Sequence, residues 1–130
     1  MKAYLIDPIK EEISIVDYNG DIKQIQELIE ADLFDVVYPF KNQDAVYVDD
    51  MGLMKQVNFY FQIKYDNGRN QDLFGLGLVL GVDDEGNGVE PKISLETLKD
   101  KVTFRGAVSI RQGEGGFNIY PLSKPKGGIQ

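Results

Sequence analysis

Apolar and polar residues alternate along much of this chain, which is the pattern of strands that bury one face. The alternation is clearest over 57–65, where one face holds Val57, Phe59, Phe61, Ile63 and Tyr65. Residues 73–82 alternate differently, with Phe74 and three leucines on one side and small residues on much of the other. We expect further strands over 3–6, 11–18, 33–40, 45–48, 103–111 and 117–120.

Two segments have helical spacing instead. After Asp21, the apolar residues recur at three- and four-residue intervals, at Ile22, Ile25, Leu28 and Ile29. Asp21 is a suitable N-cap, and Gln24 follows it as in a capping box. Ser94 precedes a second amphipathic segment in the same way. We therefore predict helices over about 21–31 and 94–101.

These elements predict an α+β fold, a mostly antiparallel sheet of about six to eight strands with two short helices. A chain of 130 residues has the usual length of a single domain. We expect that domain to span 1–122, followed by a flexible tail over 123–130. The sequence leaves open whether residues 105–130 pack on the same domain or exchange between chains.

Histidine and cysteine are both absent from the sequence. Their absence excludes a disulfide framework, thiolate or imidazole catalysis and the usual zinc and copper sites. The remaining options are carboxylate chemistry, lysine chemistry or binding without chemistry, and no catalytic motif is present. We expect a non-enzymatic protein without a cofactor. No segment resembles a signal peptide or a membrane span, so we expect a cytoplasmic protein without a membrane partner.

The net charge of −7 is unevenly distributed. Residues 101–130 contain five basic residues and one acidic residue, a net +4, so the first hundred residues have a net charge of −11. Such a charge repels phosphate backbones, and we therefore do not expect nucleic acid to be a partner.

One acidic cluster, Asp83, Asp84 and Glu85 with Asn87 and Glu90, offers oxygen atoms to Ca²⁺ or Mg²⁺. Its spacing does not fit an EF-hand, however. A solvated turn is the favoured interpretation.

Gly75, Gly77 and Gly81 lie within the 73–82 segment and not at a junction between a strand and a helix. A dinucleotide-binding loop requires that junction, so we reject this interpretation. The glycines instead predict a strand face against which an aromatic ring or another backbone lies closely. The protein's own ring is favoured over a ligand or a partner.

Two further sets of residues are candidate binding sites. Tyr60 and Lys64 lie on the polar face of 57–65, where an exposed tyrosine can anchor an interface, although exposed aromatic residues are also common on half-covered sheets. Arg105 and Arg111 are six residues apart, so uninterrupted alternation would place them on one face. Such a pair suits a phosphate or carboxylate, and it equally suits the protection of a sheet edge.

Several segments also resemble a known family. These are LIDP at 5–8, VDDMGLM at 48–54, GLVLGVDDEG at 77–86, PKISLE at 91–96 and KVTF at 101–104. They are similar to a family of small uncharacterised proteins found mainly in tailed bacteriophages, including those that infect cyanobacteria. The resemblance covers about residues 1–104 and implies no activity. It implies a viral protein that works in the cytoplasm of a bacterial host.

These observations favour a phage accessory protein that binds a host or phage macromolecule, most simply a protein, through a charged surface without catalysis. The alternative is a module that binds a nucleotide, another anion or a divalent metal. The sequence also leaves open a homo-oligomer.

Overall fold

The computed structural model describes residues 1–50, 57–113 and 116–121, without the side chains of residue 57 and of residues beyond 109. This part of the chain forms ten strands and two helices. In chain order the elements are β1 (Lys2–Asp7), β2 (Glu12–Asp17), α1 (Ile22–Leu28), β3 (Phe34–Val37), β4 (Ala45–Asp49), β5 (Val57–Lys64), β6 (Asn70–Phe74), β7 (Gly77–Val82), β8 (Gly88–Val89), α2 (Leu95–Lys101), β9 (Val102–Gly113) and β10 (Gly116–Pro121).

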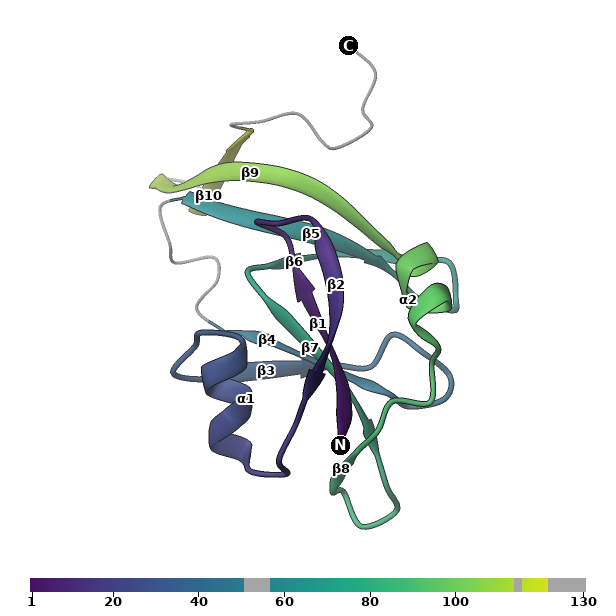
Figure 1. Ribbon diagram of the computed structural model, residues 1–130. Coiled ribbons are helices and arrows are strands. Elements are labelled where there is room, and N and C mark those ends of the chain that lie inside the picture. Colours follow the sequence, from purple (N-terminus) through teal and green to yellow (C-terminus); the bar gives the residue numbers. More distant parts are fainter. Residues whose placement is uncertain (51–56, 114–115, 122–130) are drawn as a thin grey trace.

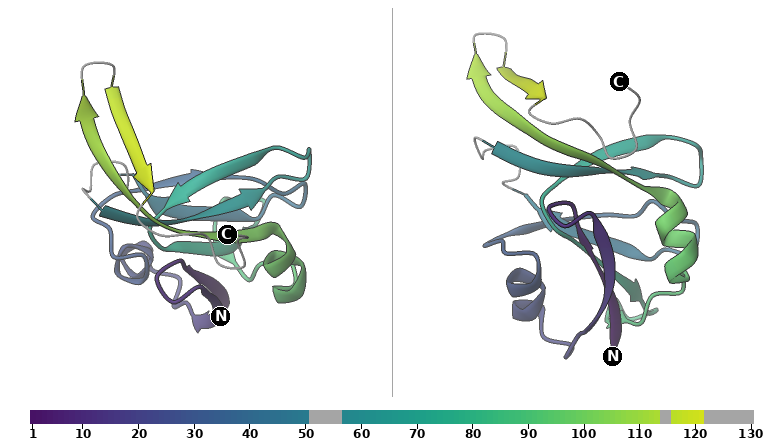
Figure 2. Two further views of the ribbon diagram at one scale, coloured as in Figure 1. Left: turned by 90° about the horizontal axis from the view of Figure 1, so that it is seen from above. Right: turned by 45° about the horizontal axis from the view of Figure 1, so that its top comes forward.

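The strands form two antiparallel sheets. The first has the order β2-β1-β7-β4-β3, with β8 paired to β7, and the second has the order β10-β9-β5-β6. The second sheet lies over one face of the first, and α1 lies on the opposite side of the first sheet (Figure 1). Figure 2 shows that β9 is long and curved, so that its outer part and β10 project away from the other strands. The predicted α+β class, with a mostly antiparallel sheet and two short helices, is confirmed.

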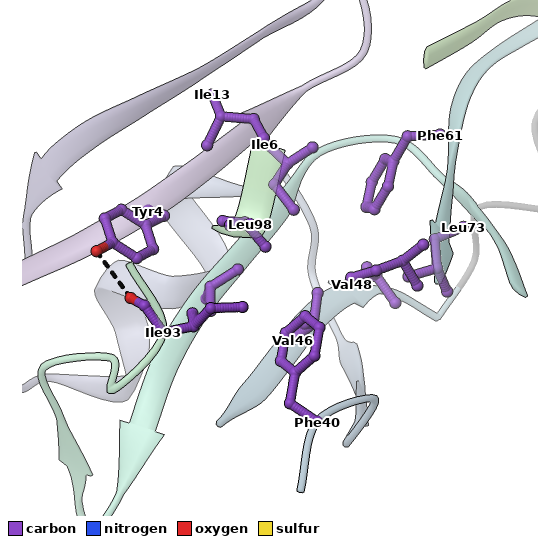
Figure 3. Packing of buried hydrophobic residues seen from close by; sticks show 12 residues of the cluster. Tyr4, Ile6, Ile13, Phe40, Val46, Val48, Phe61, Leu73, Ile93 and Leu98 are labelled. Atoms are coloured by element: carbon purple, nitrogen blue, oxygen red, sulfur yellow. Dashed lines mark hydrogen bonds between the residues drawn. The ribbon is translucent and has the colours of Figure 1, made fainter. Parts of the chain in front are cut away.

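Strand β7 lies in the middle of the first sheet and is buried on both faces. Leu78 and Leu80 contribute to a cluster with Ile25 of α1 and with Ile29, the residue that follows this helix. Val79 contributes to the larger cluster between the two sheets, which also contains Tyr4 and Leu98. Part of this larger cluster is shown in Figure 3, where the hydroxyl of Tyr4 donates a hydrogen bond of 2.9 Å to the carbonyl of Ile93. This bond attaches the segment that precedes α2 to the first sheet.

The segment predicted as one strand over 73–82 forms two strands in different sheets. Its first residues complete β6 in the second sheet, and its last residues form β7 in the first. Gly75 lies between them with φ +85°, a conformation that residues with a side chain rarely adopt. Its N–H donates to the carbonyl of Phe59 at 2.8 Å. This change of sheet and the short strand β8 bring the number of strands above the six to eight predicted.

The predicted burial of 57–65 needs a similar correction. Phe61 and Ile63 are completely buried, but Phe59 is 37% exposed and its neighbour Asn58 only 4% exposed. The pairing of β5 with β9 shifts between Tyr60 and Phe61, so that β9 contains one extra residue there. This bulge interrupts the alternation of faces in β9. Strand β5 has no extra residue, and the burial of its apolar face simply does not extend from Phe61 to Phe59.

Both predicted N-caps are confirmed. The carboxylate of Asp21 accepts the N–H of Lys23 at 3.0 Å, and the hydroxyl of Ser94 accepts the N–H of Thr97 at 3.2 Å. The Gln24 side chain differs from a capping box, because its oxygen accepts the N–H of Asn19, at 2.7 Å, instead of the N–H of Asp21. Helix α1 also ends at Leu28, before the predicted boundary.

Candidate binding site: an aromatic pocket beside helix α1

A pocket of about 320 Å³ lies where the end of β2, helix α1, strands β3 and β4, and the turn between β7 and β8 meet. It combines aromatic rings, aliphatic side chains and the backbone of a glycine-rich turn. The described residues that line it are Tyr18, Gly20, Ile22, Ile25, Phe34, Tyr47, Leu80, Gly86, Asn87 and Gly88.

On one side of the pocket, the Tyr18 ring fills the space left by the missing side chain of Gly88. A Cβ atom at Gly88 would lie 3.4 Å from Cε2 of Tyr18, so the tyrosine ring packs against this bare position. Gly20 has φ +89°, which lets the chain turn sharply between Tyr18 and α1. The predicted turn at Asn19-Gly20-Asp21 therefore shapes one end of the pocket.

Three aromatic rings supply its walls. Phe34 and Tyr47 pack edge to face, with ring centroids 5.3 Å apart and an interplanar angle of 84°. Tyr18 is only 3% exposed. Within the described part of the chain, the hydroxyls of Tyr18 and Tyr47 make no hydrogen bond. Among the described residues, no buried side-chain oxygen or nitrogen lacks a hydrogen-bond partner. The Tyr18 hydroxyl, which makes no such bond, therefore reaches solvent and is available to a bound group.

The electrostatic surroundings keep both tyrosines neutral. Burial raises the pKa of Tyr18 above its ordinary value, and the nearby carboxylate of Asp21 raises it further. Burial also raises the pKa of Tyr47, followed by the effects of Tyr38 and Tyr18. None of the described lining residues is basic. The pocket therefore offers ring faces and neutral hydroxyl oxygens near a carboxylate, which is the combination that attracts an organic cation.

The predicted acidic cluster forms the turn next to this pocket. One carboxylate oxygen of Asp83 accepts the N–H groups of Glu85 and Asn87, at 2.9 and 2.8 Å. The hydrogen bond from Asn87 is the main reason why the pKa of Asp83 lies below its usual range. Asp84 and Glu85 are exposed, and among the described residues no three acidic side chains are arranged to hold a metal. Asp83 therefore organises the turn that presents Gly86 to Gly88 to the pocket.

The other residues that were predicted as candidate binding sites do not line this pocket. Tyr60 stacks on Phe74 in the second sheet, with centroids 5.2 Å apart and an interplanar angle of 21°. Lys64 is exposed at the end of β5. Arg105 is partly buried at the β9 bulge, while the side chain of Arg111 lies outside the described residues. The extra residue in β9 breaks the alternation on which the shared face of Arg105 and Arg111 was predicted.

The three glycines that were predicted to form a bare strand face, Gly75, Gly77 and Gly81, have different surroundings. A Cβ atom at Gly77 would lie 2.9 Å from Cζ of Phe61, and one at Gly81 only 2.4 Å from the carbonyl oxygen of Glu90. Among the described residues, no atom outside its immediate neighbours lies within 4 Å of the same position at Gly75. At Gly77 and Gly81 the protein's own ring and backbone occupy the space beside the strand.

The pocket was not predicted from the sequence, because its three rings come from separate segments. Tyr18 follows β2, Phe34 begins β3 and Tyr47 lies within β4. The available signal was an aromatic residue next to a glycine turn, at Tyr18-Asn19-Gly20. That signal does not identify the segments that complete the pocket, which depends on how the strands pair.

The comparisons with known proteins identify the family. No curated protein and no solved structure matches the chain. A family model, described as a domain of unknown function (DUF3846), matches residues 1–102. This range agrees with the expected resemblance to uncharacterised proteins over about residues 1–104. The chain therefore belongs to the DUF3846 family of domains of unknown function.

Proposed function

We propose that this protein is a non-catalytic binding module that receives a cationic side chain of a macromolecular partner in the aromatic pocket. The observation that supports this proposal most strongly is the Tyr18 hydroxyl. It makes no hydrogen bond within the described part of the chain, and although the whole residue is only 3% exposed, the oxygen itself is not buried and can meet a ligand. Tyr47 and Phe34 complete an aromatic site into which an arginine or lysine side chain fits.

The charge of the chain favours the same type of partner. A net charge of −11 over the first hundred residues attracts a basic surface and accelerates its association. A cation over an aromatic face contributes about 0.5–1 kcal/mol when exposed and about 2 kcal/mol when desolvated. The acidic surface thus increases the rate of encounter, and the pocket adds specificity for a basic side chain.

We further propose that the partner is a protein of a bacterial host or of a phage, and that binding takes place in the host cytoplasm. The phage origin rests on the resemblance of the segments at 77–86 and 91–96. Over the described residues, no helix is long and apolar enough to cross a membrane. The lack of histidine and cysteine, together with the acidic charge, supports protein binding over catalysis or nucleic-acid binding.

Calorimetric titration with a tetra-arginine peptide tests the proposal, with a tetra-glutamate peptide as the charge-reversed control. We expect the arginine peptide to bind at about 20 mM salt and to bind more weakly at about 300 mM salt. Tyr47→Leu should weaken binding by about 5- to 30-fold, since it removes a ring but keeps an apolar side chain. Tyr60→Leu, which changes a tyrosine of the other sheet, should leave the affinity unchanged.

Two results would count against this function. Equal affinities of the Tyr47→Leu variant and the wild type would exclude the pocket, and a lack of binding at low salt would remove the support for a cationic ligand. Thermal melts with nucleotides, Ca²⁺ and Mg²⁺ examine the alternative module, because a ligand of the folded state raises the melting temperature. A rise with any of them would favour that alternative.

A further inference from the structure

Strand β3 ends the first sheet, and in the described part of the chain no strand pairs with its outer edge. The edge is short and mostly apolar, with the sequence Phe-Asp-Val-Val, in which Asp35 is exposed. Residues next to it are unusually exposed for their type, since Leu33 is 61% and Tyr38 57% exposed. A mostly apolar edge without a partner strand is a surface for the addition of another strand.

From these features we infer that β3 pairs with β3 of a second copy of this chain, antiparallel and centred on Val36. The two first sheets then form one continuous sheet across a two-fold axis. This inference does not rest on the proposed function, although Phe34 contributes both to this strand and to the pocket. Three properties of the strand support it: the direction of its backbone groups, the choice of register and the pairing of its side chains.

The pairing with β4 determines which backbone groups point outward. The carbonyl of Leu33 accepts the N–H of Asp50 at 3.4 Å, which continues the register in which Phe34 lies opposite Asp49. Hydrogen-bonded pairs alternate along antiparallel strands. Every second residue from Leu33 onward therefore bonds to β4. The N–H and C=O groups of Phe34 and Val36 point away from β4, toward the open edge, and we extend the same alternation to Tyr38, which directly follows the strand.

The outward N–H and C=O groups of one β3 must bond to the outward groups of the other β3, which limits the possible registers. Pairing centred on Asp35 would place two Asp35 carboxylates opposite each other, and like charges in directly opposed positions are unfavourable. Pairing centred on Val37 would require Phe40, which is only 5% exposed, to lie opposite Phe34. Pairing centred on Val36 avoids both problems. It places Val36 opposite Val36, Asp35 opposite Val37, and Phe34 opposite Tyr38.

The selected register also pairs the half-buried Phe34 with the exposed Tyr38. Phe34 and Tyr38 occur twice in a symmetric interface, so they form two aromatic cross-strand pairs, which stabilise antiparallel sheets. Phe34 lines the aromatic pocket, and Tyr38 of the second copy thus approaches that pocket from the neighbouring strand. The second copy adds an aromatic residue beside each site.

The interface is small, and each chain has a net charge of −7. We therefore expect a weak, concentration-dependent dimer that added salt strengthens by screening the repulsion between the copies. This salt effect is opposite to the one expected for the binding of a basic peptide. The two proposals can thus fail independently of each other.

Sedimentation over about 1 µM to about 1 mM protein, at low and moderate salt, measures the dimer directly. Val36→Pro removes an N–H group that points away from β4, so the variant should remain folded by circular dichroism and stay monomeric. A monomeric wild type throughout this range would overturn the inference. Equal dimerisation of the Val36→Pro variant and the wild type would also overturn it.

Cross-linking tests the register, because the natural sequence contains no cysteine. A short bismaleimide should join two copies of the Val36→Cys variant, whose thiols lie opposite each other at the two-fold axis. Ile15→Cys is the matched control, because Ile15 is 57% exposed on β2, the other edge strand of the same sheet. A several-fold higher yield of cross-linked dimer for Val36→Cys is expected. Equal yields for the two variants would overturn the proposed pairing.

Discussion

Substitution of Gly77 by alanine adds one methyl group at a tightly packed point between the two sheets. Gly77 lies in β7, opposite Ile6 of β1 and Val48 of β4. The new Cβ atom would lie 2.9 Å from Cζ of Phe61 and 3.6 Å from Cγ1 of Val46. Contacts below about 3 Å require a neighbour to move, and the Phe61 ring is completely buried. The ring can only move by displacing other core residues.

The size of the effect follows from two opposing contributions. Overpacking a well-filled core costs about 1–3 kcal/mol. Replacing glycine by alanine regains about 0.4–1 kcal/mol, because the unfolded chain loses conformational freedom. Since Gly77 does not have a positive φ angle, backbone strain adds nothing. We expect a net loss of about 1–2 kcal/mol, which lowers the melting temperature of a chain of this length by about 4–8 °C.

Urea denaturation of Gly77→Ala, Phe61→Leu and the double variant measures this contact. The smaller leucine leaves room for the methyl group, so Gly77→Ala should cost at least about 1 kcal/mol less in the Phe61→Leu background. Gly88→Ala is the control, because its nearest neighbour would lie at an ordinary distance of 3.4 Å. Additive effects of the two substitutions, or a Gly77→Ala variant as stable as the wild type, would refute the reasoning.

Three further substitutions test other parts of the fold. Asp44 is fully buried and accepts two backbone N–H groups ahead of α2, so Asp44→Ala should lower the unfolding free energy by about 3 kcal/mol and Asp44→Asn by less, as measured in urea. The carboxylate of Asp66 accepts a hydrogen bond from the N–H of Lys41, which is the main cause of its lowered pKa. The ionised Asp66 therefore stabilises the fold above the ordinary pKa of aspartate, and this stabilisation is lost as the pH falls through the lowered pKa. The stability difference between wild type and Asp66→Asn should therefore be constant near pH 7 and disappear in acid; a difference that persists at the lowest pH would contradict this assignment. Gly81→Ala should separate β8 from β7, because the new Cβ atom would lie 2.4 Å from the carbonyl oxygen of Glu90. Hydrogen exchange over residues 83–90 should then be accelerated in the variant relative to the wild type, and more than in the rest of the sheet.

The elements that depend on local chemistry were predictable from the sequence. Asp21 and Ser94 mark the starts of both helices because N-cap side chains act on neighbouring backbone groups. The burial of Phe61 and Ile63 follows from alternation in the same way. These predictions need no knowledge of which elements meet in space.

The remaining features depend on pairing between distant segments. The alternation over 73–82 could not reveal that the chain changes sheets at Gly75, because leucines and glycines continue to alternate through the bend. The bulge opposite Tyr60 was hidden for a similar reason, since it lies in a different strand. The aromatic pocket requires Tyr18, Phe34 and Tyr47 to converge, and only the strand order of the first sheet brings them together.

The position of β7 between β1 and β4 determines when the first sheet can form during synthesis. Its two neighbours are complete by residue 49, but β7 itself ends at residue 82. Until it emerges from the ribosome, the β1–β2 and β3–β4 hairpins each have an apolar edge without a partner. The nascent chain is therefore most exposed to aggregation in this interval, and the arrival of β7 joins the two hairpins in one step.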